Sequence, residues 1–180
     1  MKVVYLGDIM GRSGRKIVAE KLPEIKERLK PDFIVVNGEN AAAGFGITSK
    51  IVKELFEMGV DVISTGNHVW DQKETKTYIN TEKRLIRPIN FPAGTSGKGS
   101  IVVEDTLGRR MLVVNAMGRV FMDALDDPFK AVDEELKKYV QEESIYTYTF
   151  ENKNLMWAYE DPSIQSNQLF YRREGTNRPS

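Results

Sequence analysis

Short apolar runs alternate with longer amphipathic segments in the first third of the chain. Three runs of aliphatic and β-branched side chains predict buried strands, at residues 3–6, 33–36 and 60–64. Residues 15–29 and 49–58 carry apolar side chains at helical spacing, with Thr48 as N-cap and Gly59 as stop of the second helix. Strands alternating with such helices predict βαβ units and a parallel sheet, so the expected fold class is α/β.

The middle of the chain has a different pattern. Residues 88–99 are rich in Pro and Gly, which predicts an irregular loop. Residues 101–104 and 111–115 resemble two strands joined by a tight turn, so we expect an antiparallel hairpin whose second strand enters the sheet. Pro128 opens a further amphipathic helix that should end near Gln141.

The pattern weakens after about residue 141. Residues 145–150 have the composition of a strand, but the remainder is polar and aromatic without a sustained period. We therefore expect one domain over residues 1–140 and a divergent tail over residues 141–180, with the tail packed less well than the body.

Composition and charge exclude several classes of protein. Lys plus Arg and Asp plus Glu both number 26, so no overall field favours bulk nucleic acid or a membrane surface. The chain has no cysteine, which leaves metal binding to carboxylates, amides and imidazole. The first residues resemble neither a signal peptide nor a membrane span, and a cytoplasmic protein is expected.

Polar groups able to bind metals follow each of the first three predicted strands. These groups are Asp8, Glu39, Asn40, Asn67 and His68. Because the carboxyl ends of neighbouring parallel strands meet at one crevice, residues far apart in sequence should converge there. The set consists mostly of hard oxygen donors, which suit Mn, Mg or Fe and are usable by Zn. A glycine beside each group, at Gly7, Gly38 and Gly66, permits tight turns at the strand ends and close approach of the backbone to an ion or phosphate.

Each residue also has a purely structural interpretation. Asp8 alone could begin a turn, and Glu39 with Asn40 could form an Asx-rich turn. His68 is the only histidine, and a lone histidine is more often a surface or satisfied core residue than a ligand. Its position after Gly66 and Asn67, at a third strand end, favours a functional role. The conjunction of all these groups carries more weight than any one of them.

Four stretches resemble the motifs of a known family: GDIMGRSGR, NGENAAAGFGIT, GNHVWD and RPINFPAGTSGKG. They are similar to those of the calcineurin-like metallophosphoesterases, and within them to the bacterial 2',3'-cyclic-nucleotide 2'-phosphodiesterases. The resemblance covers residues 1–140 and implies a layered metallophosphoesterase-like sheet. It implies that such a protein hydrolyses small phosphodiesters or cyclic nucleotides with two divalent ions, whether Fe, Mn, Mg or Zn.

The resemblance also implies a role for each candidate residue. Asp8 and Asn40 would ligate one metal, Glu39 would bridge two, Asn67 would ligate the second and His68 would donate a proton. Met10 stands where the wider superfamily has histidine, a departure that the subfamily shares.

The family's second half supplies three further histidine ligands, and this sequence has none of them. The C-terminal part of the fold is therefore expected to be missing or replaced. Truncation, a change of reading frame and a replaced C-terminus remain alternatives.

Three hypotheses about the function of the chain, each from a different class of protein, follow from these observations. The chain is a phosphodiesterase whose missing ligands come from another chain or are dispensable, a non-catalytic metal- or nucleotide-binding module, or a fragment whose tail serves folding or assembly. In the last case the tail aromatics would form a homo-oligomer interface. These aromatics are Tyr146, Tyr148, Trp157, Tyr159, Phe170 and Tyr171.

Overall fold

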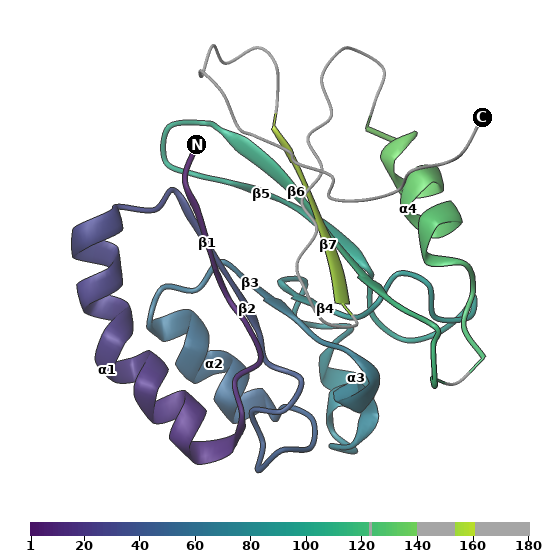
Figure 1. The fold of residues 1–180 in the computed structure, drawn as a ribbon, viewed down its shortest axis with the longest axis horizontal. Coiled ribbons are helices and arrows are strands. Elements are labelled where there is room, and N and C mark those ends of the chain that lie inside the picture. The colour runs from purple at the N-terminus through teal and green to yellow at the C-terminus, as the bar shows by residue number, and fades with distance from the viewer. Residues whose placement is uncertain (123, 140–153, 161–180) are drawn as a thin grey trace, which may run out of the picture.

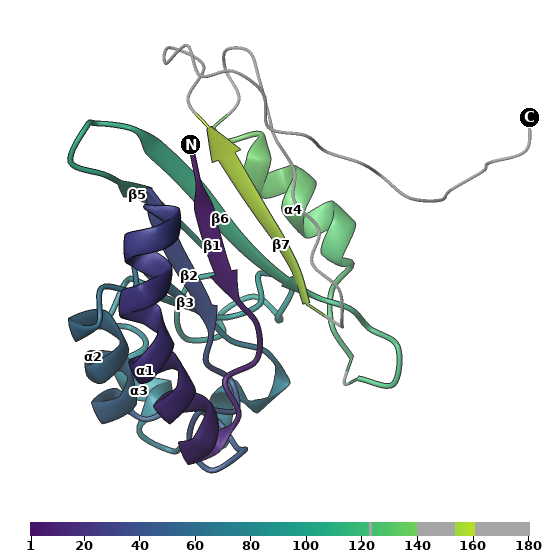
Figure 2. The same cartoon turned by 60° about the vertical axis from the view of Figure 1, so that its left-hand side comes forward.

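Two β-sheets pack face to face; helices cover the outer side of the first, and a helix near the end of the described chain covers the outer side of the second (Figures 1 and 2). The first sheet is parallel, with strand order β1-β2-β3-β4, and the second is antiparallel, with order β5-β6-β7. The computed structural model describes residues 1–122, 124–139 and 154–160, the last of these as backbone. The predicted layered α/β fold with βαβ units is confirmed.

The parallel sheet is built by the first half of the chain. Its strands are β1 (Val3–Leu6), β2 (Phe33–Asn37), β3 (Val62–Ser64) and β4 (Leu85–Ile86). Helix α1 (Gly11–Leu29) connects β1 to β2, and α2 (Ser49–Glu57) connects β2 to β3. The hydroxyl of Thr48 accepts a hydrogen bond from the Ile51 N–H at 3.3 Å, so its predicted N-cap role is confirmed.

Successive side chains of β2 point to opposite faces of the parallel sheet, so both faces need a cover. Ile34 and Val36 pack under the helices, in a cluster with Leu22 of α1 and Leu55 of α2. Phe33 and Val35 point to the opposite face, where they meet the second sheet. All five residues of β2 are buried, as expected for a central strand covered on both faces.

The second sheet consists of β5 (Ser100–Glu104), β6 (Arg110–Met117) and β7 (Asn154–Glu160). The predicted hairpin of β5 and β6 is confirmed, but the expectation that its second strand enters the parallel sheet is wrong. Met111 and Val113 face the parallel sheet. Leu112 and Val114 face helix α4 (Pro128–Leu136). Strand β6 is therefore covered on both faces and belongs to a second sheet.

Several elements differ from the sequence prediction. Helix α1 begins at Gly11, four residues before its predicted start, and α4 ends at Leu136, short of its predicted end. Strand β7 and the short elements β4, η1 (Asn67–Trp70) and α3 (Thr75–Tyr78) were not predicted. The strand expected at residues 145–150 lies outside the described residues. No helix in the described part of the chain is long and apolar enough to cross a membrane.

The packing between the sheets is testable at Met111, which is 1% exposed. Met111→Ala should lower the free energy of unfolding by about 2–5 kcal/mol, because it removes buried methylenes and leaves a cavity between two rigid sheets. Urea denaturation would measure it. Leu107→Ala, in the same hairpin but at a side chain that is 75% exposed, should stay within about 0.5 kcal/mol of the wild type. Equal effects would contradict face-to-face packing.

Candidate functional site

The polar loops that follow β1, β2 and β3 are joined to one another through the backbone. The N–H of Ile9 donates to the carbonyl of Asn37 at 3.0 Å, which links the end of β1 to the end of β2. The N–H of Gly38 donates to the carbonyl of Ser64 at 2.9 Å, which links β2 to β3. The three loops therefore form one continuous edge, as the parallel sheet predicts.

Asp8 and Asn40 are brought into direct contact at this edge. The Asn40 amide Nδ2 donates to Asp8 Oδ2 at 2.8 Å, although 32 residues separate them in the sequence. The backbone carbonyl of Asn40 also accepts from the N–H groups of Gly11 and Gly44, at 2.9 and 3.0 Å. Asn40 is 8% exposed whereas Asp8 is exposed. The Asn40 amide nitrogen thus holds a carboxylate that solvent reaches.

Glu39 joins the ends of β2 and β3. Its N–H donates to Asn37 Oδ1 at 2.9 Å, and Asn37 Nδ2 donates to Glu39 Oε1 at 3.3 Å. A Cβ atom at Gly66 would lie 2.1 Å from Oε2 of Glu39 and 2.8 Å from Oε1. The carboxylate therefore lies against the backbone at the end of β3, in space that only glycine leaves open. Glycine at position 66 thus admits a carboxylate, and the close approach of an ion or phosphate to the backbone stays a prediction.

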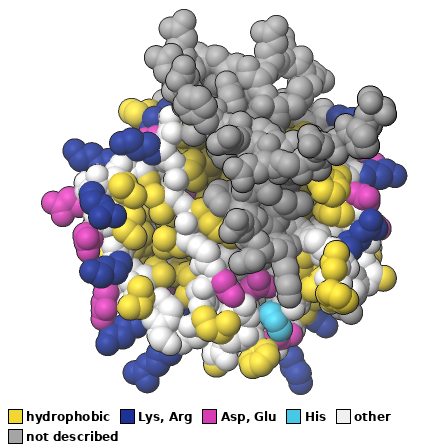
Figure 3. All heavy atoms as spheres, in the orientation of Figure 1, with side chains coloured by type: hydrophobic (Ala, Val, Ile, Leu, Met, Phe, Trp, Pro, Cys, Tyr) yellow, Lys and Arg dark blue, Asp and Glu magenta, His cyan; other side chains and the backbone are white. Residues whose placement is uncertain are grey.

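His68 and Asn67 begin the short helix η1 directly after Gly66. His68 Nδ1 lies 2.6 Å from Asp71 Oδ2, and the side chain of His68 is 34% exposed. The ring of Phe45 meets the imidazole edge to face, with 5.7 Å between centroids. Asp71 therefore holds the imidazole through Nδ1. Asn67 is exposed beside them. In the space-filling view, acidic side chains gather next to the histidine (Figure 3).

The donor set fits one divalent ion better than two. Among the described residues, no three His, Asp or Glu side chains form a metal-binding group. Asp8, Asn40 and Glu39 together offer two carboxylates and an amide oxygen at one edge, which is a set of hard donors suited to Mn or Mg. A second ion would rely on Glu39 and Asn67. The residues present fit the first ion, and the second needs ligands beyond them.

The YmdB-like protein family matches residues 4–157. The chain belongs to this family. It is 46% identical over 134 residues to a 2',3'-cyclic-nucleotide 2'-phosphodiesterase of Bacillus subtilis, a match that covers 74% of this chain and 50% of that protein. It is 37% identical over 108 residues to a putative phosphatase/phosphodiesterase of Mycoplasma pneumoniae, covering 58% of this chain and 38% of the relative.

Solved structures agree with this assignment. A protein from Thermus thermophilus, described as hypothetical, superposes with a TM-score of 0.71 at 43% identity, over 79% of this chain and 54% of that one. A phosphatase from Mycoplasma pneumoniae superposes with a TM-score of 0.70 at 33% identity, over 77% and 51% of the two chains. The predicted family resemblance is confirmed. The chain spans about half the length of the curated relatives that it matches.

Sequence reasoning missed two residues that hold the site of this YmdB-like protein. Asn37 positions both the N–H and the carboxylate of Glu39, and Asp71 positions His68. Their signals were an Asn two residues before Glu39 in NGEN and an Asp three residues after His68 in GNHVWD. The side chain of Asn37 is in turn hydrogen-bonded to the side chain of Tyr5. Burial raises the pKa of Tyr5.

The other two strand-end glycines do not share the role of Gly66. A Cβ atom at Gly38 would meet the side chains of Ile47 and Ile63, at 2.8 and 3.0 Å, so Gly38 serves core packing. Apart from its chain neighbours, no described residue has a heavy atom within 4 Å of a Cβ atom at Gly7, so no contact among them requires glycine there.

The contact between Gly66 and Glu39 is testable by a double-mutant cycle. Gly66→Ala should lower the free energy of unfolding by about 1–3 kcal/mol, because the new methyl group displaces the Glu39 carboxylate. In a Glu39→Ala background the same substitution should cost much less, since the clashing group is absent. Gly7→Ala is the matched control, at a strand-end glycine with open space around it, and should cost less than Gly66→Ala in both backgrounds. Additive effects of Gly66→Ala and Glu39→Ala would contradict the contact.

Proposed function

We propose that the chain carries the metal-binding half of a phosphodiesterase site that acts on small phosphodiesters, cyclic nucleotides among them. The observation that carries this proposal is the convergence of Asp8, Asn40 and Glu39, from two strand ends, with Glu39 lying against Gly66 of a third. The substrate class is supported by the name of the Bacillus subtilis relative, at 46% identity.

Each residue has a proposed role. Asp8 and Asn40 would hold one divalent ion, Glu39 would contact both ions, and Asn67 would hold the second. Ions bound there supply Lewis acidity toward phosphoryl oxygens and a water molecule of lowered pKa. The same proposal places the protein in the cytoplasm, where a chain without cysteine has no disulfide to lose.

His68 is proposed as the proton donor to the leaving oxygen. The Asp71 carboxylate 2.6 Å from Nδ1 holds the imidazole so that Nε2 faces outward. An alkoxide leaves poorly without a proton, and a positioned acid contributes on the order of 10²–10⁴ in rate. Gly46 keeps the neighbouring loop close, because a Cβ atom there would lie 3.0 Å from the carbonyl oxygen of His68.

A metal- or nucleotide-binding module without turnover is the second candidate function. It is favoured by the small number of protein ligands for the second ion, since the sequence contains a single histidine. Oxygen-preferring divalent ions take about six ligands, and Glu39 with Asn67 supplies few of them. We therefore expect the chain to hydrolyse substrate far more slowly than the Bacillus subtilis relative.

The test is hydrolysis of bis(p-nitrophenyl) phosphate and of 2',3'-cyclic AMP by the purified chain, with and without Mn²⁺. Turnover should be weak, should require the ion, and should fall on both substrates in Asp8→Ala. His68→Ala should lose on the order of 10²–10⁴ on the cyclic nucleotide, whose leaving group is an alkoxide. It should lose little on the nitrophenyl ester, because that leaving group needs no proton.

Glu57→Ala is the matched control, since Glu57 is an exposed acid on α2 away from the strand ends, and it should leave turnover unchanged. Equal losses on both substrates in His68→Ala would exclude the proton-donor role. Turnover that survives Asp8→Ala would exclude the proposed metal site. Binding of Mn²⁺ without any turnover would favour the non-catalytic module.

A further inference from the structure

The RPINFPAGTSGKG stretch has no part in the site proposed above. It begins at Arg87, directly after β4, and Arg87 is only 9% exposed. The N–H of Arg87 donates to the carbonyl of Lys98 at 2.9 Å, which ties the two ends of the loop together. The guanidinium donates to four carbonyls inside the loop, those of Pro88, Ile89, Thr95 and Ser96. Arg87 thus fixes the loop and, with it, the position of Lys98.

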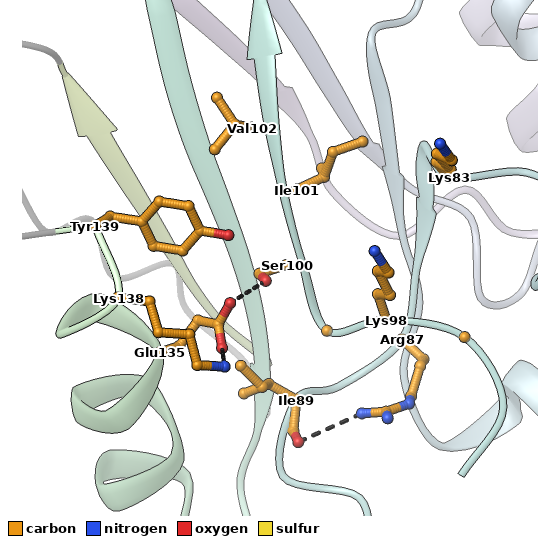
Figure 4. A pocket seen from close by; sticks show the side chains of 12 residues that line it. Lys83, Arg87, Ile89, Lys98, Ser100, Ile101, Val102, Glu135, Lys138 and Tyr139 are labelled. Carbon is orange, nitrogen blue, oxygen red and sulfur yellow. Dashed lines mark hydrogen bonds and ion pairs between the residues drawn. The ribbon is translucent and has the colours of Figure 1, made fainter. Parts of the chain in front are cut away.

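A pocket of about 620 Å³ opens beside this loop, between β5 and the end of α4 (Figure 4). Lys83, Arg87 and Lys98 stand on one side of it, and Lys138 and Tyr139 on the other. Its apolar lining comes from Ile89, Ile101 and Val102. The lining includes none of the candidate metal ligands, so this pocket is distinct from the site at the ends of β1, β2 and β3.

The pocket carries an excess of positive charge. Its lining has four cationic side chains and one acidic side chain, Glu135. Glu135 is already engaged, since it accepts from Ser100 Oγ at 2.6 Å and from Lys138 Nζ at 2.5 Å. Within the described part of the chain, the three remaining cations form no ion pair. They are Lys83, Arg87 and Lys98. The formal charge of the whole chain is zero, so this excess is local.

The three cations differ in what they can contact. The guanidinium of Arg87 donates its hydrogen bonds to backbone carbonyls of the loop, so Arg87 is a fixed positive charge at the side of the pocket. Burial lowers the pKa of Arg87, because solvent reaches its guanidinium poorly. Lys83 and Lys98 are exposed, and their ammonium groups keep their donors for a ligand.

We propose that this pocket binds the phosphate group of a small organic phosphate. Lys83 and Lys98 contact the phosphate oxygens, which are charge-assisted acceptors, and Arg87 adds a fixed positive charge behind them. The organic part of the ligand lies against Tyr139 and the apolar lining. The proposal does not depend on phosphodiesterase activity, because the two sites share no residue.

The test is calorimetric titration of the full 180-residue chain with AMP, inorganic phosphate and adenosine, in buffer containing EDTA so that no metal contributes. AMP should bind more tightly than phosphate, and adenosine should bind most weakly. Lys83→Ala/Lys98→Ala should weaken AMP binding by about tenfold or more, because two charge-assisted contacts are lost. Asp8→Asn should leave the affinity unchanged.

The matched control is Lys53→Ala/Lys76→Ala, which removes the same two charges at exposed lysines outside the pocket. It should bind AMP as the wild type does. Equal losses in the two double variants would overturn the proposal, since they would report net charge alone. No AMP binding by the wild-type chain would overturn it as well. Equal affinities for phosphate and AMP would overturn the assignment to an organic phosphate.

Discussion

The parallel register of β1, β2 and β3 brings every candidate ligand to one edge of the sheet, and the chemistry of the molecule depends on it. Leu6 pairs with Val36, and Asn37 pairs with Ser64, so the three strands end at nearly the same level. A slip of one residue would exchange the faces of the β2 side chains, so that Ile34 and Val36 would no longer pack under the helices and Phe33 and Val35 would no longer meet the second sheet. Both sets are apolar, so it is their fit against these two covers that fixes the register. The register in turn brings the candidate ligands together.

The site concentrates polar groups where the core ends. Glu39 is 7% exposed and Asn37 is 3% exposed, and each uses the other as a hydrogen-bond partner. Keeping a carboxylate away from water is costly, and a nearby cation offsets that cost. The absence of a side chain at Gly66 makes room for Glu39, while Asn40 orients Asp8 from the other side. This arrangement supports the proposal that the edge holds a divalent ion.

The strands and helices of the first half follow from short-range pattern, which is why β1, β2, α2 and the hairpin of β5 and β6 were predictable. Among the elements that were missed, β4 is too short for such a pattern, whereas β7 contains an apolar run at residues 155–159 that was not recognised as a strand. Strand β4 has two residues and is defined by its pairing with β3, and β7 is defined by its pairing with β6. At the early start of helix α1, the N–H of Gly11 donates to the Asn40 carbonyl, a contact across 29 residues that the local pattern does not contain.

The candidate site divides in the same way. The residues at the strand ends were visible, because position after an apolar run is a local signal. Asn37 and Asp71 were not, because their roles appear only as contacts, at 2.9 Å to the Glu39 N–H and 2.6 Å to His68. The tail aromatics proposed as an interface stay a prediction, as do the domain boundary near residue 140 and the homo-oligomer.

The central claim is that Asp8, Asn40 and Glu39 form a site for a divalent ion, and Mn²⁺ binding followed by electron paramagnetic resonance tests it most directly. The wild-type chain should bind one Mn²⁺ well and a second weakly or not at all. Glu39→Gln and Asp8→Asn should each abolish the tighter binding, since each removes a charged ligand. Glu57→Gln, an exposed acid on α2, should bind as the wild type does. Tight Mn²⁺ binding that survives both site substitutions would contradict the account.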